Sequence, residues 1–206
     1  MNKNLLLVTT ILLAAAFIAA SVFAYYPLQL TVQPTAPPVA FAAGTNANQL
    51  DLGSGNTISV SVGQNSTSAT IAIHPTYHTT YYKNVTIIKN TDNKAYNVWL
   101  VLDQVANTLP SGSKVYLVVY NKGASRDLGT GYPEPGTPQE GGNVIRVIEL
   151  TAQNTNSPIQ IGQLNGNGGT WEIDFLVYIP EGASIRGASA TFSMHIVYTP
   201  GGEMPP

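Results

Sequence analysis

Three histidines are the side chains with the clearest potential to bind a metal ion. His74 and His78 stand four positions apart, a spacing that brings two ligands to one face of a helix. Pro75 and the strand-forming residues around the pair argue against a helix, and His195 lies in the pattern of a strand. We therefore expect loop and sheet histidines, with neither a metal site nor another cofactor.

A pair of carboxylates is the second candidate for chemistry. Glu172 and Asp174 alternate with apolar residues, so both lie on one face of the expected strand. Two carboxylates can catalyse glycoside hydrolysis, but a solvated outer sheet face gives the same pattern, and we favour that interpretation. The sequence also lacks a Gly-x-Ser-x-Gly elbow. We expect no catalytic residues and no enzymatic activity, and a secreted hydrolase is the least favoured class.

Two tripeptides match the acceptor pattern for N-linked glycan. They begin at Asn65 and Asn84, and the modification requires an exported chain and an accessible side chain. Asn65 lies in a turn-forming cluster and is the better candidate. Asn84 lies in an expected strand and has to point outward to qualify.

Composition restricts the partners of this chain. It has 206 residues, enough for one full-sized core, and 44% of them are hydrophobic. Charged residues are 10% of the chain and the net charge is −2, so a basic face for nucleic acid is not expected. There is no cysteine, which excludes disulfides and thiolate metal sites. Stability must come from packing and assembly.

The first 24 residues have the pattern of an export signal. Lys3 is the only charged residue there, and an apolar run from Leu5 to Ala20 follows it. Val22 and Ala24 provide small residues at the positions that signal peptidase reads. We therefore predict a signal peptide over residues 1–24 and a mature chain that begins at Tyr25 outside the cell. A retained membrane anchor is the alternative.

Residues 25–43 differ from the rest of the chain. Apolar and polar side chains alternate from Leu28 to Val32, as in a half-buried strand. Three prolines then predict an extended linker, with a short apolar patch after it at residues 39–43. The sequence thus predicts a strand on a Pro-rich tether.

Residues 44–206 show a series of strands separated by turn chemistry. We expect strands at 56–62, 69–73, 82–89, 96–105, 114–120, 144–150, 171–179 and 190–198. Asn, Gly and Pro clusters lie between them, and no crossover helices are evident. The pattern predicts an all-β sandwich of two antiparallel sheets, either a jelly roll or an immunoglobulin-like fold. The polar loop at 122–143 is predicted to be a surface excursion or a subunit contact.

Two segments carry a resemblance to a known group of proteins. The strand pair from Tyr81 to Leu100 and the closing strand from Ala190 to Tyr198, after a signal peptide, resemble the secreted TasA/camelysin biofilm-fibre proteins and the archaeal bundling pilins. The resemblance lies in the order of the segments and in the amino-acid composition of the strands. It implies a jelly-roll subunit that polymerises by donor-strand complementation at the cell surface. The protease label of camelysin is not carried over, because the chain lacks a zincin motif.

Strand donation is also physically plausible for this chain. An incomplete sandwich exposes an unpaired edge and an apolar groove, which a strand from a neighbour can fill. Because donor and groove lie on different parts of one subunit, the contact does not close and yields a head-to-tail homopolymer. Lateral bundling of such filaments is possible, and a small-molecule substrate is not expected. The expected donor residues are Tyr25, Tyr26, Pro27, Leu28, Leu30 and Val32.

Two other classes remain open at the level of sequence. The first is a type IV pilin-like subunit that retains its N-terminal helix. The second is a surface adhesive or carbohydrate-binding sandwich, in which aromatic side chains stack on sugars. The aromatic candidates are Tyr77, Tyr81, Tyr82 and Trp99.

Overall fold

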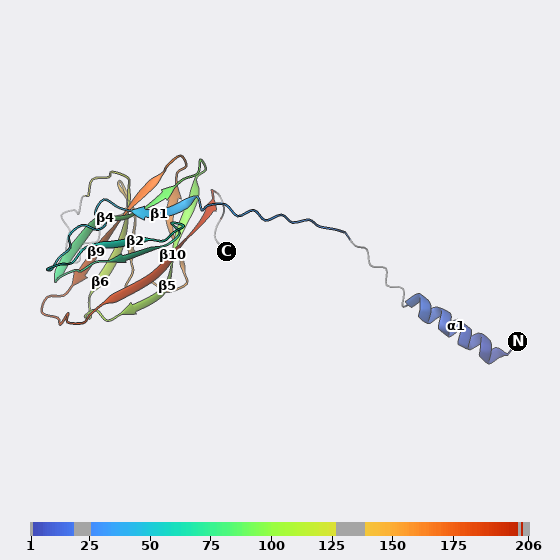
Figure 1. Ribbon diagram of the computed structural model, residues 1–206. Helices are drawn as coiled ribbons and strands as arrows, with labels where there is room; N and C mark the ends of the chain where they lie inside the picture. Colours follow the sequence, from blue (N-terminus) through green and yellow to red (C-terminus); the bar gives the residue numbers. More distant parts are fainter. Residues whose placement is uncertain (1, 19–25, 127–138, 202, 204–206) are drawn as a thin grey trace. The chain divides into compact units, whose positions relative to one another are not determined.

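The computed structural model describes residues 2–18, 26–126, 139–201 and 203 (Figure 1). Strands make up 47% of the structure and helix 6%. Contacts divide the chain into two units, residues 1–35 and residues 36–206. The second unit contains all of the strands.

The first unit consists of one helix and an extended segment. The helix α1 (Lys3–Ile18) has Lys3 as its single charged residue, and the hydroxyls of Thr9 and Thr10 donate to carbonyls one turn earlier. Within the described residues, no helix combines the length and the apolar character that crossing a membrane requires. The cleavage site predicted after Ala24 lies outside the described residues.

A five-stranded antiparallel sheet forms one layer of the second unit. Alternating apolar residues explain these strands, because a period of two places every second side chain on the core face. The strands, in their order across the sheet, are β1 (Val39–Ala43), β4 (His78–Asn90), β9 (Thr170–Ile179), β6 (Lys114–Asn121) and β7 (Val144–Glu149).

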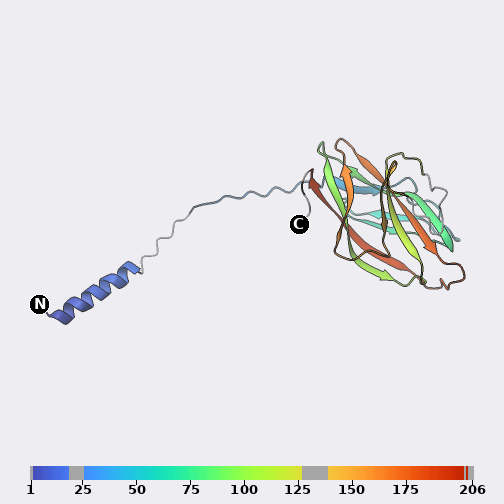
Figure 2. The same ribbon diagram turned by 180° about the vertical axis from the view of Figure 1, so that it is seen from behind.

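Two smaller antiparallel sheets contribute to the same core from the other side, and Figures 1 and 2 show the arrangement from opposite directions. One has the order β10 (Ala190–Pro200), β5 (Tyr96–Asn107) and β8 (Pro158–Leu164). The other pairs β2 (Ser59–Val62) with β3 (Ala69–Ala72). β1 lies beside β2, the Phe41 N–H of β1 donates to the carbonyl of Ser66 in the β2–β3 turn at 2.8 Å, and β7 lies beside β8. Among the described residues, the strands thus form a ring that is continuous except between β3 and β10.

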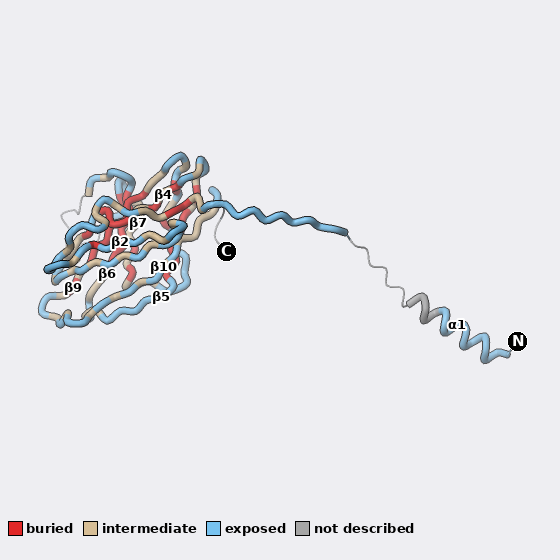
Figure 3. The backbone as a smooth tube through the Cα atoms, viewed as in Figure 1, coloured by how far each residue is buried: buried red, intermediate tan, exposed pale blue. Residues whose placement is uncertain are grey.

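The main core lies between these layers, and buried residues gather there in Figure 3. The central strand β9 supplies Trp171, Ile173 and Phe175 to it. The opposite face of β9 is buried as well, because Leu176 belongs to a second, smaller cluster with Tyr120 of β6. A strand buried on both faces is ordinarily found in the middle of a layered structure.

The expectation of an all-β chain with antiparallel sheets is confirmed, and each of the eight expected strands has a counterpart. Two strands were not predicted, β1 and β8. The structure places Val39–Ala43 in the five-stranded sheet, although we had grouped residues 25–43 as donor strand and linker. The division between the two units accordingly falls after Thr35 and not after residue 43.

Candidate functional site

A long apolar groove lies where the ring of strands is interrupted. Its volume is about 760 Å³, and it opens between β3 and β10. β3 is the outer strand of its two-stranded sheet, and β10 is the outer strand of its three-stranded sheet. The facing edge of each therefore has no strand partner among the described residues, which leaves main-chain donors and acceptors available for a further strand.

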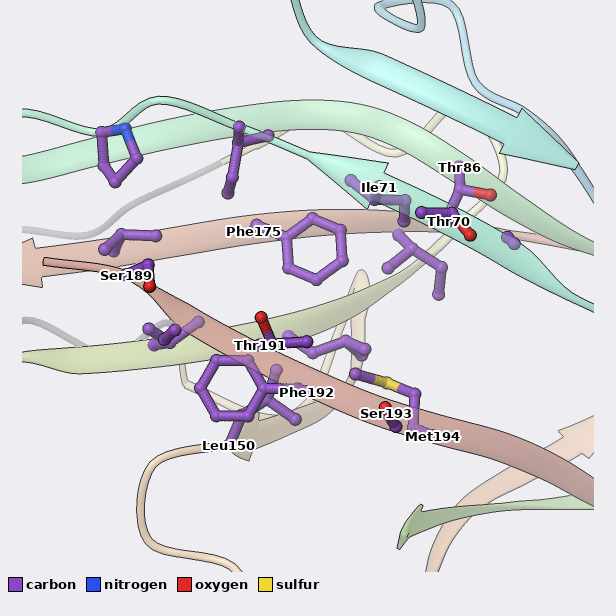
Figure 4. A pocket seen from close by; sticks show the side chains of 18 of the residues that line it. Thr70, Ile71, Thr86, Leu150, Phe175, Ser189, Thr191, Phe192, Ser193 and Met194 are labelled. Atoms are coloured by element: carbon purple, nitrogen blue, oxygen red, sulfur yellow. The ribbon is translucent and has the colours of Figure 1, made fainter. Parts of the chain in front are cut away.

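Apolar side chains from eight strands line the groove, and β3, β9 and β10 supply those at its centre (Figure 4). Phe175 of β9 lies on the floor, between Ile71 of β3 on one side and Phe192 and Met194 of β10 on the other. Ionisable groups are rare among the lining residues, which include His74 and Asp103. The groove thus favours an uncharged, apolar occupant.

Side chains of the groove walls face the core but are less buried than core-facing side chains elsewhere in the sandwich. Phe192 and Met194 point toward the core, yet both are only half-buried, as is Ile71. On the part of the core away from the groove, inward-facing residues such as Val98 and Val119 are 0% exposed. The difference arises because nothing among the described residues covers the walls, and apolar area left in water is unfavourable.

The expected donor segment is exposed along its described length (Figure 3). Leu28 is 92% exposed, Leu30 81% and Val32 75%. Tyr26 and Pro27 are exposed too, and Tyr25 lies outside the described residues. The structure has no strand at residues 26–32, because a strand is defined by a ladder and this segment has no partner. Because the apolar residues alternate strictly, one face of the extended segment is apolar and exposed to water.

A buried ionic cluster lies on the other face of the five-stranded sheet. Glu172 and Asp174, which we expected on a solvated outer face, are 8% and 0% exposed, so that interpretation was wrong. Arg126 covers them: its Nε lies 2.8 Å from Oδ2 of Asp174, and its Nη2 lies 2.7 Å from Oε2 of Glu172. The guanidinium also stacks 4.2 Å above the ring centre of Tyr120.

Hydrogen bonds complete this cluster. Asp174 accepts bonds from the Tyr81 hydroxyl and from the backbone N–H of Asn84 at 2.7 Å. Glu172 accepts a bond from the Gly123 N–H at 2.9 Å. Desolvation raises the pKa of Glu172, but the Gly123 N–H and the guanidinium outweigh it and hold the pKa below its usual range. The cluster anchors the start of the 122–143 loop to β9; residues 127–138 lie outside the described residues.

The two glycan acceptor sites differ in accessibility. Asn65 is exposed in the turn between β2 and β3, as a modified residue has to be. Asn84 is 6% exposed and sits in an irregularity of the β4–β9 ladder with a φ of 44°. Our condition for Asn84, an outward-facing side chain, is not met in this structure.

The three histidines do not converge. His74 contacts Asp51 at 3.0 Å, His78 contacts Glu181 at 3.2 Å, and His195 contacts Asp103 at 2.9 Å. Within the described part of the chain, no three His, Cys, Asp or Glu side chains are arranged to hold a metal ion.

The aromatic candidates for stacking on sugars do not form an exposed platform. Tyr82 and Trp99 are 4% and 6% exposed. The hydroxyls of Tyr77 and Tyr81 are engaged with the Ala183 carbonyl and with Asp174. These rings therefore serve packing in the subunit.

Comparison with known proteins adds no identification. No protein-family model matches the chain, and no curated protein matches its sequence. The groove between β3 and β10 is therefore the feature from which function has to be inferred.

Proposed function

We propose that the chain is the structural, non-enzymatic subunit of an extracellular filament with a jelly-roll sandwich. Residues 1–24 direct export and are then removed. Residues Tyr25 to Val32 of one copy fill the groove between β3 and β10 of the next. The observation that carries the proposal is an uncovered apolar groove, in an otherwise continuous ring of strands, on a chain that also presents an exposed, alternating apolar segment.

The segment and the groove match in length and in polarity. β10 lines the groove with five consecutive residues, Ala190 to Met194. The alternation from Leu28 to Val32 also covers five residues, and each stretch spans about 13 Å at the rise of a strand. The segment contains no charged residue, as the groove requires. An inserted strand can bond to two main-chain edges at once.

Burial energies indicate which contacts matter. Full burial of Leu28, Leu30 and Val32 contributes roughly 1.5–3 kcal/mol for each side chain. Association itself costs about 4–15 kcal/mol in lost freedom, so side-chain burial alone gives a modest affinity. Main-chain hydrogen bonds along β3 and β10 have to supply the rest, and this favours a strand over any other occupant.

The assembly that follows is a head-to-tail homopolymer at the cell surface. Donor and acceptor are different surfaces of one subunit, so the contact repeats without closing and generates a filament. Lateral bundling would use the outer surface of the sandwich. The resemblance to secreted fibre proteins supports the same assembly.

A pair of charge substitutions tests the proposal. Leu30→Asp places a carboxylate on the face that enters the groove, where its burial is strongly disfavoured, and should abolish filaments in negative-stain micrographs. Thr31→Asp adds the same charge to the solvent face of the same segment and should leave filaments intact. Equal polymerisation of the two variants would refute donation by this segment.

Deletion of residues 25–32 provides a second test. The truncated chain should remain a soluble subunit that does not polymerise. A synthetic peptide of the deleted residues should then raise its melting temperature in a concentration-dependent way, because a ligand that binds the folded state stabilises it by mass action. A Leu30→Asp peptide is the matched control. Normal filaments from the truncated chain would place the subunit contacts elsewhere.

A further inference from the structure

The two ends of the sandwich can be told apart by the strands that begin and finish there. β4 ends at Asn90, and β1 begins beside it, because Val39 pairs with Asn90. We call this the Asn90 end. At the other end β9 finishes, and β4 begins where His78 pairs with Ile179. We call this the Ile179 end.

The two strands that border the groove run in opposite directions. β10 starts with Ala190 at the Ile179 end and finishes with Pro200, which pairs with Tyr96 just after the β4–β5 turn at the Asn90 end. β3 leads through residues 73–77 to His78, so it runs toward the Ile179 end. Figure 4 shows the same opposition in the order of Ser189 to Met194 and of Thr70 to Ile71. A single strand between them must be parallel to one and antiparallel to the other.

The tether joins its own sandwich at the Asn90 end. Thr91 follows β4 directly, and its N–H donates to the Pro38 carbonyl at 2.8 Å. Residues 33–38 therefore connect the donor segment to this end, and six extended residues reach at most about 20 Å. When subunits stack end to end in one orientation, the Asn90 end of the donor faces the Ile179 end of the acceptor.

From these directions we infer the polarity of the donated strand, an inference that rests on the proposed function. The donor segment lies antiparallel to β10 and parallel to β3, with Val32 near Ala190 at the Ile179 end and Leu28 near Met194. The reverse polarity would carry the tether past about 13 Å of groove before it turned back, and this uses most of its reach.

The strand edges favour the same polarity. β10 has 11 residues and β3 has 4, so the longer ladder can form with β10. Antiparallel pairing is slightly more stable per residue than parallel pairing, and the longer ladder gains more from it. In this register Leu30 faces the groove beside Phe192.

The direction of the bound segment also distinguishes donation to a neighbouring subunit from insertion into the groove of the same subunit. A segment that entered the groove of its own sandwich would come from the Asn90 end, which places Val32 near Met194 and makes the segment parallel to β10. Polarity therefore reports whether the groove is filled by the same chain or by another copy.

Engineered disulfides can measure the polarity, because the chain has no cysteine of its own. Gln33→Cys with Ser189→Cys joins positions that are opposite each other in the antiparallel arrangement. Gln33→Cys with His195→Cys joins positions that are opposite in the parallel one. Ser189 and His195 are exposed and lie six residues apart, about 20 Å along the strand, whereas a disulfide needs Cα atoms within about 7 Å. A register shift of two residues adds about 7 Å along the strand and takes either pair out of disulfide reach, so each pair tests the register together with the direction.

Filaments of each full-chain variant should be oxidised mildly and run on a non-reducing gel, with micrographs to verify assembly. The inference expects a covalent ladder of multimers for Gln33→Cys with Ser189→Cys, and none for the His195→Cys pair. A ladder from the His195→Cys pair would overturn the polarity but keep strand donation. An intramolecular bond in that pair would overturn both, because the chain would fill its own groove. Filaments in which neither pair crosslinks would overturn the inferred register and polarity, and normal filaments from the chain that lacks residues 25–32 would overturn the proposed function itself.

Discussion

Removal of the Arg126 guanidinium should cost this subunit a large part of its stability. Arg126→Met leaves Asp174 without a cation at 0% exposure, and it leaves Glu172 beside it on the same strand face. Breaking a buried ion pair by the loss of one partner typically costs about 3–5 kcal/mol. Since small domains are stable by only about 5–15 kcal/mol, we expect a large fall in the denaturation midpoint.

Chemical denaturation of the full chain measures this loss. If the proposed strand donation is right, the Leu30→Asp background keeps the subunit monomeric, so that protein concentration does not enter the unfolding equilibrium. The midpoint should fall while the slope stays unchanged. Adding Glu172→Gln and Asp174→Asn is the matched control: both amides keep an acceptor oxygen but carry no charge, so stability should partly return.

The dependence on pH has a definite sign. In the parent chain the pKa of Glu172 lies below its usual range, so its contribution is present above about pH 4.3, the ordinary value for glutamate, and is lost as pH falls through the lower folded value. Without Arg126 the desolvated carboxylate is protonated more readily, so the deficit of the variant should shrink toward pH 4. A deficit under about 1 kcal/mol at pH 7 would refute the reasoning, because it is the value of an exposed pair.

Three further results are expected. Intact-mass measurement of native protein should give a chain that begins at Tyr25, whereas Leu5 or an earlier residue in the assembled product would favour a pilin-like subunit with a retained helix. Glycopeptide mass spectrometry on native material should find glycan on Asn65, and a fully unmodified peptide there would remove the site. Gly44→Ala should lower the free energy of unfolding by about 1–3 kcal/mol, because the new Cβ would lie 2.1 Å from the Asn84 carbonyl oxygen; an unchanged melting temperature would contradict this.

Local alternation in the sequence was sufficient to predict most of the strands. The two that escaped prediction carry weak local signals. β1 follows Pro37 and Pro38 directly and contains three alanines, so it reads as the end of a linker. β8 begins with a proline, and three of its seven residues are glycine or glutamine, beside the β-branched Ile159 and Ile161. Their pairing with β4 and β5, distant in sequence, makes them strands.

Of the two parts of the candidate site, the donor segment could be predicted from the sequence and the groove could not. The alternation of Leu28, Leu30 and Val32 is visible in the sequence, whereas the groove depends on which strand edges remain unpaired after the whole chain has folded. The ionic cluster was misread for a similar reason. Arg126 covers Glu172 from a position 46 residues away, and strand periodicity carries no information about what packs on a face.

The gap between β3 and β10 in the ring of described strands has a consequence for the two ends of the proposed assembly. In a chain of subunits linked through their grooves, every interior groove is occupied, but one terminal subunit keeps an empty groove and the opposite terminal subunit keeps an unused Leu28–Val32 segment. The two tips are therefore chemically different. One presents a groove that can bind an extended apolar strand, and the other presents an unpaired apolar strand. Growth, capping and attachment to another surface would each act on one tip and leave the other untouched.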